Sequence, residues 1–124
     1  MNGFCSVQLT VESDLTAYPC DFYALDEYKL GTVGVDSLDE ILGGEAAKAF
    51  IRESLRVPAE CEGCQYRPLC RNGCRRDRLI ANDGAIGLNY YCEAYKHFFA
   101  RCGEKMTSII TQPARSIQAR SPER

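Results

Sequence analysis

Half of the chain's eight cysteines fall within fourteen residues, in the spacing C-x2-C-x5-C-x3-C: Cys61, Cys64, Cys70 and Cys74. Cys92 follows further along the chain. Thiolates separated by two residues can turn toward one metal centre, and the longer gaps let further sulfurs reach that centre or a second one. Gly63, Pro68 and Gly73 supply the backbone freedom and the stiff turn that such a loop requires. The pattern predicts a metal site.

Three kinds of site use so many cysteines. Eight could form four disulfides in ~105 pairings, but residues 1–5 show no export signal, so we expect reduced thiols. A zinc ribbon usually shows paired C-x2-C knuckles or histidine ligands, whereas this chain has one such knuckle and one histidine, His97. Iron–sulfur clusters take cysteine thiolates, four for each cluster. We favour iron–sulfur, with zinc and disulfides as the alternatives.

The composition bounds the class of protein. A chain of 124 residues with a formal charge of −2 is one small domain or the end of a larger one, with no general attraction to nucleic acid or to an anionic membrane. No apolar stretch approaches the ~20 residues that span a bilayer, so we expect a soluble, cytoplasmic protein. A loop-rich domain of this size commonly needs bound metal to be stable.

The N-terminal third predicts a small sheet. Residues 4–11 alternate apolar and polar side chains, residues 12–14 form a turn, and residues 15–20 return as a second strand. This β-hairpin would place Cys5 near Cys20. We expect a third extended piece at residues 21–25, followed by a turn and a short strand within residues 26–34.

Helices are predicted on both sides of the cysteine loop. Ser37 and Glu40 have the spacing of a capping box, which predicts a short helix to Leu42. A glycine pair interrupts it, and a second helix is expected over residues 45–55, ended by Pro58. A longer helix, with Cys92 near its start, is expected from Asn89 to about Ile110.

These elements together predict the fold class. We expect a small, loop-rich α+β iron–sulfur domain with an N-terminal β-hairpin, a cysteine loop and a C-terminal helix, over residues 1–110. Residues 111–124 are polar and interrupted by proline, which predicts a disordered tail.

The cysteine pattern from Cys20 to Cys92 resembles that of the SPASM domain, the cluster-binding C-terminal extension of many radical S-adenosylmethionine enzymes. Three further stretches resemble the anaerobic sulfatase-maturating enzymes in particular. They are YPCDFY at 18–23, YRPLCRNGCRRDR at 66–78, and NYYC at 89–92 with HFF at 97–99. The resemblance covers residues 5–99, most of the chain.

The resemblance implies two [4Fe-4S] clusters and a ligand set for each. By position, the outer cluster would be held by Cys61, Cys64, Cys70 and Cys92. Cys5, Cys20 and Cys74 would contribute to the inner cluster. The family's fourth inner cysteine lies six residues before the position of Cys5, which would fall before Met1, and Cys102 is too far from the pattern to replace it.

The family's radical-generating motif is absent from this sequence. That motif is C-x3-C-x2-C on a partial α/β barrel, and the one C-x3-C here, Cys70 to Cys74, is followed by Asp77 where the third cysteine would stand. The length also leaves no room for a barrel. The sequence therefore resembles the C-terminal third of such an enzyme, and S-adenosylmethionine is expected only if an upstream segment or another chain supplies the barrel.

Asp21 is the candidate catalytic residue. In the family, a hydrogen atom is removed from the β-carbon of a cysteine or serine in a sulfatase, and loss of a proton and an electron leads to Cα-formylglycine. Asp21 matches the family's proposed proton acceptor, and a carboxylate next to ligand Cys20 suits that role. Judged without the resemblance, an aspartate here is more simply a turn residue that bonds nearby amides.

Arginines flank the cysteines at positions 71, 75, 76 and 78. They could donate hydrogen bonds to cluster sulfurs and raise a reduction potential, or bind an acidic partner. For the individual arginines we favour a solvated basic loop balanced by neighbouring carboxylates.

The resemblance makes a peptide or sulfatase the expected partner, together with a barrel that this chain lacks. The chain by itself is not expected to generate a radical. Two other classes of function stay open: a standalone iron–sulfur module for electron transfer or peptide binding, and a structural zinc domain.

Overall fold

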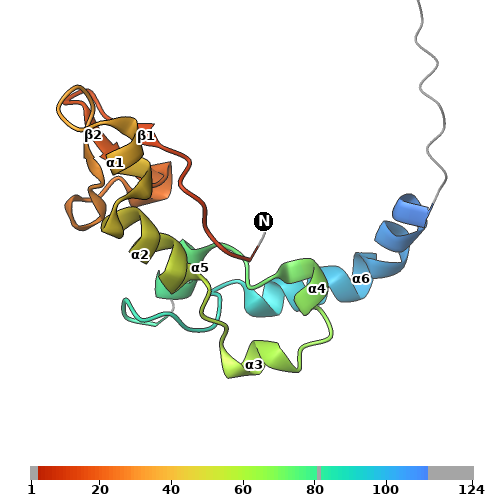
Figure 1. The fold of residues 1–124 in the computed structure, drawn as a ribbon. Helices are drawn as coiled ribbons and strands as arrows, with labels where there is room; N and C mark the ends of the chain where they lie inside the picture. The colour runs from red at the N-terminus through yellow and green to blue at the C-terminus, as the bar shows by residue number, and fades with distance from the viewer. Residues whose placement is uncertain (1–2, 81, 112–124) are drawn as a thin grey trace, which may run out of the picture. The chain divides into compact units, whose positions relative to one another are not determined.

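The computed structural model describes residues 3–80 and 82–111, in two compact units that are treated separately below. The first unit covers residues 1–92 and holds all the strands and all but one of the described helices. The second begins at Glu93 and contains the rest of the C-terminal helix (Figure 1). The tail expected at residues 111–124 lies outside the described residues except for Thr111, which ends that helix.

The sheet consists of three short antiparallel strands in the order β1-β2-β3. They are β1 (Thr10–Val11), β2 (Thr16–Tyr18) and β3 (Gly31–Thr32). Thr10 pairs with Tyr18, and Thr16 pairs with Thr32. The central strand β2 is buried along its whole length. The predicted hairpin is confirmed, although its strands are shorter than expected.

Local backbone geometry explains why the strands are short. Leu9 has a φ of 51°, in the left-handed region, which ends the regular strand one residue before β1. The pairing continues through a single bond, from the Gln8 amide to the Pro19 carbonyl at 2.7 Å. At the turn, the Asp14 carboxylate accepts from both the amide and the hydroxyl of Thr16.

The prediction of an extended segment at residues 21–25 is wrong. The chain instead forms two 3-10 turns, η1 (Asp21–Tyr23) and η2 (Asp26–Tyr28). The Tyr23 amide donates to the carbonyl of Cys20 at 2.9 Å, and the Phe22 amide donates to the Asp21 carboxylate. These local bonds tighten the chain directly after Cys20 and turn Tyr23 into the core.

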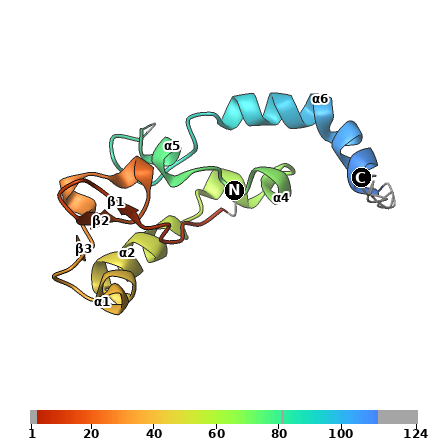
Figure 2. The ribbon, with the colours of Figure 1, turned by 90° about the horizontal axis from the view of Figure 1, so that it is seen from above.

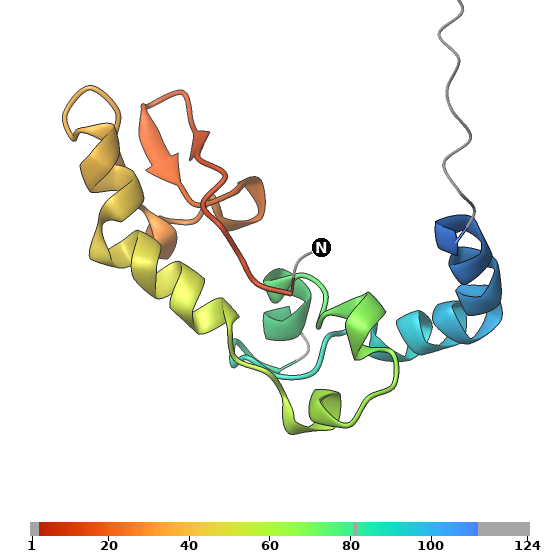
Figure 3. The ribbon, with the colours of Figure 1, turned by 45° about the vertical axis from the view of Figure 1, so that its right-hand side comes forward.

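Two consecutive helices, α1 (Leu38–Gly43) and α2 (Glu45–Ser54), run beside the sheet (Figures 2 and 3). The capping box is confirmed: the Glu40 amide donates to the Ser37 hydroxyl, and the Ser37 amide donates to the Glu40 carboxylate. The helix predicted over residues 45–55 is confirmed as α2, which buries Ala47 and Phe50, whereas Leu55, directly after it, is exposed.

The core of the first unit is a cluster of Tyr23, Phe50 and Leu79. Tyr23 packs edge-on against Phe50, with ring centroids 5.0 Å apart, and against Tyr28 at 4.7 Å. Leu79 comes from α5 (Arg75–Ile80), a helix that the sequence reading did not anticipate. Cys5 and Cys20 pack against this cluster.

The cysteine loop contains two one-turn helices, α3 (Ala59–Glu62) and α4 (Arg67–Cys70), neither of which has a buried residue. The last helix, α6 (Cys92–Thr111), begins three residues later than expected. Its predicted first residue, Asn89, instead makes a turn in which its side chain accepts from the Tyr91 amide at 2.8 Å. Among the described residues, none of the helices is long and apolar enough to cross a membrane.

Candidate metal centre

Three of the predicted ligands, Cys5, Cys20 and Cys74, line one cavity of about 360 Å³. They form what we call the inner trio. Cys5 lies before the sheet, Cys20 follows β2, and Cys74 immediately precedes α5. Burial is the largest cause of the raised pKa of the Cys20 thiol, and negative charge on Asp21, Cys5 and Cys74 raises it further. The structure thus brings together three thiols that are far apart in sequence.

The other four predicted ligands form a second set, the outer quartet: Cys61, Cys64, Cys70 and Cys92. Burial is the largest cause of the raised pKa of Cys61, and the next three causes are the charges of its three partners. The pKa of Cys70 is raised in the same way, by burial and then by Cys92 and Cys64. No described cysteine is in a disulfide. The structure therefore brings the four thiols of the quartet within electrostatic range of one another. That either set binds a metal stays a prediction.

Three consecutive residues after Cys70 lie in the left-handed region: Arg71, Asn72 and Gly73 have φ values of 50°, 66° and 65°. The Arg71 amide donates to the Arg67 carbonyl at 2.8 Å, and the Gly73 amide donates to the Cys70 carbonyl at 3.0 Å. The amides of Asn72 and Gly73 oppose the effect of burial on the Cys70 thiol and lower its pKa. Gly73 thus has the positive φ that the sequence predicts, whereas Gly63 has a φ of −95°.

Three residues that line the inner cavity carry a buried donor without a partner. Among the described residues, the Tyr23 hydroxyl, the Arg75 Nε and the Arg78 Nε have no hydrogen-bond acceptor. All three residues line the inner cavity. Buried donors are almost always satisfied, so three orphans around one cavity indicate a missing acceptor. A thiolate-ligated iron–sulfur cluster, whose sulfur atoms accept hydrogen bonds, fits this cavity chemically.

The expectation of a solvated basic loop is wrong for Arg75 and Arg78, whose exposed fractions are 2% and 0%. Arg75 donates to the Phe50 carbonyl and pairs with Glu53 at 2.6 Å. Arg78 donates to the carbonyls of Ser54 and Arg56. The two carbonyls that Arg78 bonds lie at and just after the end of α2, where helix carbonyls lack intrahelical partners. Position 71 is exposed, as expected, and position 76 is half-buried.

The described side chains do not converge on a single ion. No three histidine, cysteine, aspartate or glutamate side chains in this part of the chain lie close enough to hold one metal ion.

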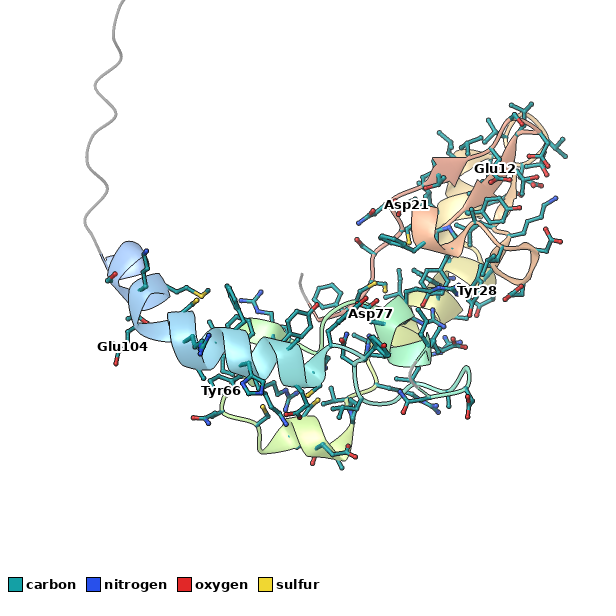
Figure 4. The ribbon with its side chains drawn as sticks, turned by 180° about the vertical axis from the view of Figure 1, so that it is seen from behind. Glu12, Asp21, Tyr28, Tyr66, Asp77 and Glu104 are labelled. Carbon is teal, nitrogen blue, oxygen red and sulfur yellow. The ribbon has the colours of Figure 1, made fainter. Side chains whose placement is uncertain are left out.

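Asp21 lies at the rim of the inner cavity, directly after Cys20 (Figure 4). It is exposed, and its Oδ1 accepts from the Phe22 amide at 3.0 Å. No described residue hydrogen-bonds the other carboxylate oxygen, Oδ2. The residue therefore bonds a nearby amide, as the turn interpretation expects, and its other carboxylate oxygen makes no hydrogen bond with the described residues.

Asn89 is a structural residue that the sequence reading did not single out. Its side chain is 5% exposed and donates to the carbonyls of Asn72 at 3.2 Å and Cys74 at 3.4 Å. A second link joins the same segments, since the Tyr90 amide donates to the Asp77 carbonyl on α5 (Figure 4). Asn89 fixes the segment before Cys92 against the loop that carries Cys74. In the sequence, the feature that could have identified Asn89 is its position three residues before Cys92, a candidate ligand.

The family to which this site belongs follows from comparison with known proteins. Residues 5–65 match the model of SPASM, described as an iron–sulfur cluster-binding domain. The match includes the first four candidate ligands and Asp21. The chain therefore carries a SPASM domain, as the cysteine pattern predicts.

Among individual proteins, the chain is similar to cysteine-type anaerobic sulfatase-maturating enzymes. It is 41% identical to the enzyme of Clostridium novyi (strain NT), over 97% of this chain and 31% of that protein. It is 46% identical to the enzyme of Clostridium perfringens (strain ATCC 13124), over 88% of this chain and 30% of that protein. It therefore spans about a third of their length.

Solved structures agree with this relationship. Native anSMEcpe with bound AdoMet superimposes with a TM-score of 0.85 at 40% identity, over 91% of this chain and 31% of that one. Native anSMEcpe with bound AdoMet and Cp18Cys peptide gives a TM-score of 0.83 at 41% identity, over 88% and 30%. The α+β architecture is that of the matching part of these proteins.

Proposed function

We propose that this chain is the auxiliary iron–sulfur part of an enzyme that oxidises a peptide cysteine or serine to Cα-formylglycine in a sulfatase. The outer quartet would hold one [4Fe-4S] cluster, and the inner trio would supply three ligands to a second. Such clusters accept and pass on single electrons. The observation that carries the proposal is the separation of seven thiols into two sets, one of them in a cavity with orphan donors.

Asp21 would hold the proton that the substrate loses. Its Oδ2 is the atom for this role, because the bond from the Phe22 amide occupies Oδ1 and keeps the side chain at the cavity rim. A positioned carboxylate of this kind typically contributes a factor of ~10² to 10⁴ to the rate. The similarity to cysteine-type enzymes and to a peptide-bound structure supports a cysteine-containing peptide as the substrate.

The barrel and its S-adenosylmethionine would come from a segment beyond these residues or from another chain. The similarity to about a third of larger enzymes supports this, as does the absence of C-x3-C-x2-C from the sequence. The residues present here would bind clusters, orient the peptide and take up a proton. We expect these activities inside the cell, where thiols stay reduced.

Iron and sulfide analysis tests the cluster assignment. The chain is reconstituted anaerobically with iron, sulfide and dithiothreitol, whose thiol can complete the coordination at the inner trio. We expect about eight irons and eight sulfides for each chain, and about four after Cys64→Ala or Cys74→Ala. Cys102→Ala is the matched control and should leave the count unchanged. A chain that binds zinc tightly and no iron would contradict the proposal.

A chimera tests the role of Asp21. This chain replaces the matching third of a cysteine-type sulfatase-maturating enzyme, which then supplies the barrel. In that chimera Asp21→Asn should lower peptide oxidation by ~10² to 10⁴ while leaving iron content unchanged. Asp26→Asn, on the neighbouring turn and outside the cavity lining, serves as the control. Equal rates for the two variants would remove Asp21 from the mechanism.

A further inference from the structure

We propose that Tyr23, Arg75 and Arg78, here called the donor set, donate hydrogen bonds to the sulfur atoms at the inner trio and raise the reduction potential of the group bound there. This inference rests on the proposed function, since it requires a cluster at that site. It goes further by assigning a task to three buried residues that are not ligands.

The first step concerns the unused donors. Each guanidinium already uses its two terminal nitrogens, on the Phe50 carbonyl and Glu53 for Arg75 and on two backbone carbonyls for Arg78. This leaves Nε of both, and the Tyr23 hydroxyl, as the only buried side-chain donors without an acceptor among the described residues. All three belong to residues that line the cavity of the inner trio.

The second step concerns charge. Arg78 is fully buried and bonds only to carbonyls, with no carboxylate partner within the described part of the chain. A buried cation without a counter-charge is costly, because it has lost its hydration. Cys5 and Cys74 lie within electrostatic range of Arg78. Ligated as thiolates, they and the sulfides of a cluster would supply the missing negative charge.

The third step concerns rigidity. The Arg75 guanidinium carbon lies 4.8 to 5.5 Å from the ring centroids of Phe50, Tyr23 and Tyr28, so three aromatic faces hold the charge in place. Arg78 is fixed by its two carbonyl bonds. Because the donors are already in place, they need little reorganisation when the group gains an electron. Fixed donors and positive charge favour the more negative, reduced state.

The outer quartet offers a contrast in the same unit. Among the described residues near it, the unpartnered buried side-chain atom is Asn72 Oδ1, an acceptor. An acceptor cannot donate to sulfur. Buried side-chain donors without partners therefore occur at the inner site and not among the described residues near the outer one.

Tyr23→Phe is the variant that tests the inference, because it removes one donor and keeps the ring that packs on Phe50 and Tyr28. It is made in a Cys64→Ala background, so that only the inner trio is loaded. Tyr28→Phe is the matched control, since it removes a hydroxyl from the adjacent ring, which does not line the cavity. Paramagnetic-resonance redox titration of the reconstituted chain gives the potential.

We expect Tyr23→Phe to lower the ratio of reduced to oxidised cluster about tenfold at fixed ambient potential, which is ~59 mV for a one-electron couple. Tyr28→Phe should leave the ratio unchanged. Melting temperature provides a second measurement: without iron, Tyr23→Phe should melt no lower than its parent, because it removes an unsatisfied hydroxyl, and with iron it should melt lower. A merely structural tyrosine would give the same change in both states.

The outcomes separate this inference from the proposed function. Unchanged potential in Tyr23→Phe, or equal shifts in both tyrosine variants, overturns the role of the donor set. Iron uptake by the parent chain but none in the Cys64→Ala background also overturns it, while leaving the outer cluster in place. No iron in the parent chain removes the proposed function itself.

Discussion

The inner trio is assembled from three separate segments, whereas the outer quartet comes chiefly from one loop. The trio borders the aromatic core, and the buried residues Arg75 and Arg78 line the same cavity. Three members of the quartet lie on α3, on α4 and between them, where neither helix buries a residue, and the fourth, Cys92, begins α6. The same ligand type is therefore held in two ways. If both sets bind clusters, we expect packing to place the thiols of the trio before metal binds, and the loop of the quartet to depend on bound metal for much of its order.

The largest expected effect is on the inner site. Phe50→Ala removes a buried ring that contacts Tyr23, Tyr28 and Arg75, and should lower the free energy of unfolding by about 3–5 kcal/mol. Denaturant unfolding measures this, and iron analysis should show loss of the inner cluster first. Val35→Ala, at a side chain that is 81% exposed, should change stability by less than about 0.5 kcal/mol. Equal loss of both clusters in Phe50→Ala would contradict the comparison.

Iron removal should affect the outer site most. Hydrogen exchange of amides in residues 59–70 should become about 100-fold faster in the iron-free chain, equivalent to ~2.7 kcal/mol of local stabilisation by bound metal. Amides of α2, which packs on the core, should change much less. If the two regions lost protection equally, the trio would depend on metal as much as the quartet does.

Asn89→Ala tests the connection between the sites. The change leaves two carbonyls and the Tyr91 amide without their partner and should cost about 1–3 kcal/mol. Asn89→Asp keeps the acceptor for Tyr91 but loses the donor to Asn72 and Cys74, so it should fall between the alanine variant and the parent chain. Thermal unfolding with iron bound measures both. An unchanged alanine variant would mean that the two sites are held independently.

The smallest expected effect lies away from both sites, at the capping box of α1. Ser37→Ala should cost ~1 kcal/mol in the iron-free chain. Hydrogen bonds from Ser37 lower the pKa of Glu40 below its ordinary value of 4.5. The stabilisation from this pair is therefore present above pH 4.5 and is lost as pH falls through the lowered value.

Denaturant unfolding of the parent chain and Ser37→Ala across pH 3 to 7 measures this difference, which should shrink in acid. Ser13→Ala, at an exposed turn residue, is the control. A difference that grew as the pH fell would show that the Glu40 carboxylate does not take part.

The sequence predicts the parts of this domain that depend on local signals. The hairpin and the capping box follow from alternation and spacing, and both are confirmed. The two ligand sets follow from the family pattern and stay a prediction. The burial of Arg75 and Arg78 and the helix α5 could not be predicted in this way. Their hydrogen-bond partners lie near the end of α2, more than twenty residues earlier in the sequence. Arginine is usually exposed, so its type argued against burial. The sequence does not predict the turn directly after Cys20, because it depends on two local hydrogen bonds, to the Asp21 carboxylate and to the Cys20 carbonyl.

The three-segment construction of the inner trio also has a kinetic consequence. Its ligands can meet only after the sheet, α2 and α5 have come together, and each such long-range closure carries an entropic cost that slows folding. The quartet draws three of its four thiols from a single short loop and can gather them early. During synthesis or reconstitution the outer position should therefore capture iron first, and the inner one should load later, on the slower timescale of tertiary folding.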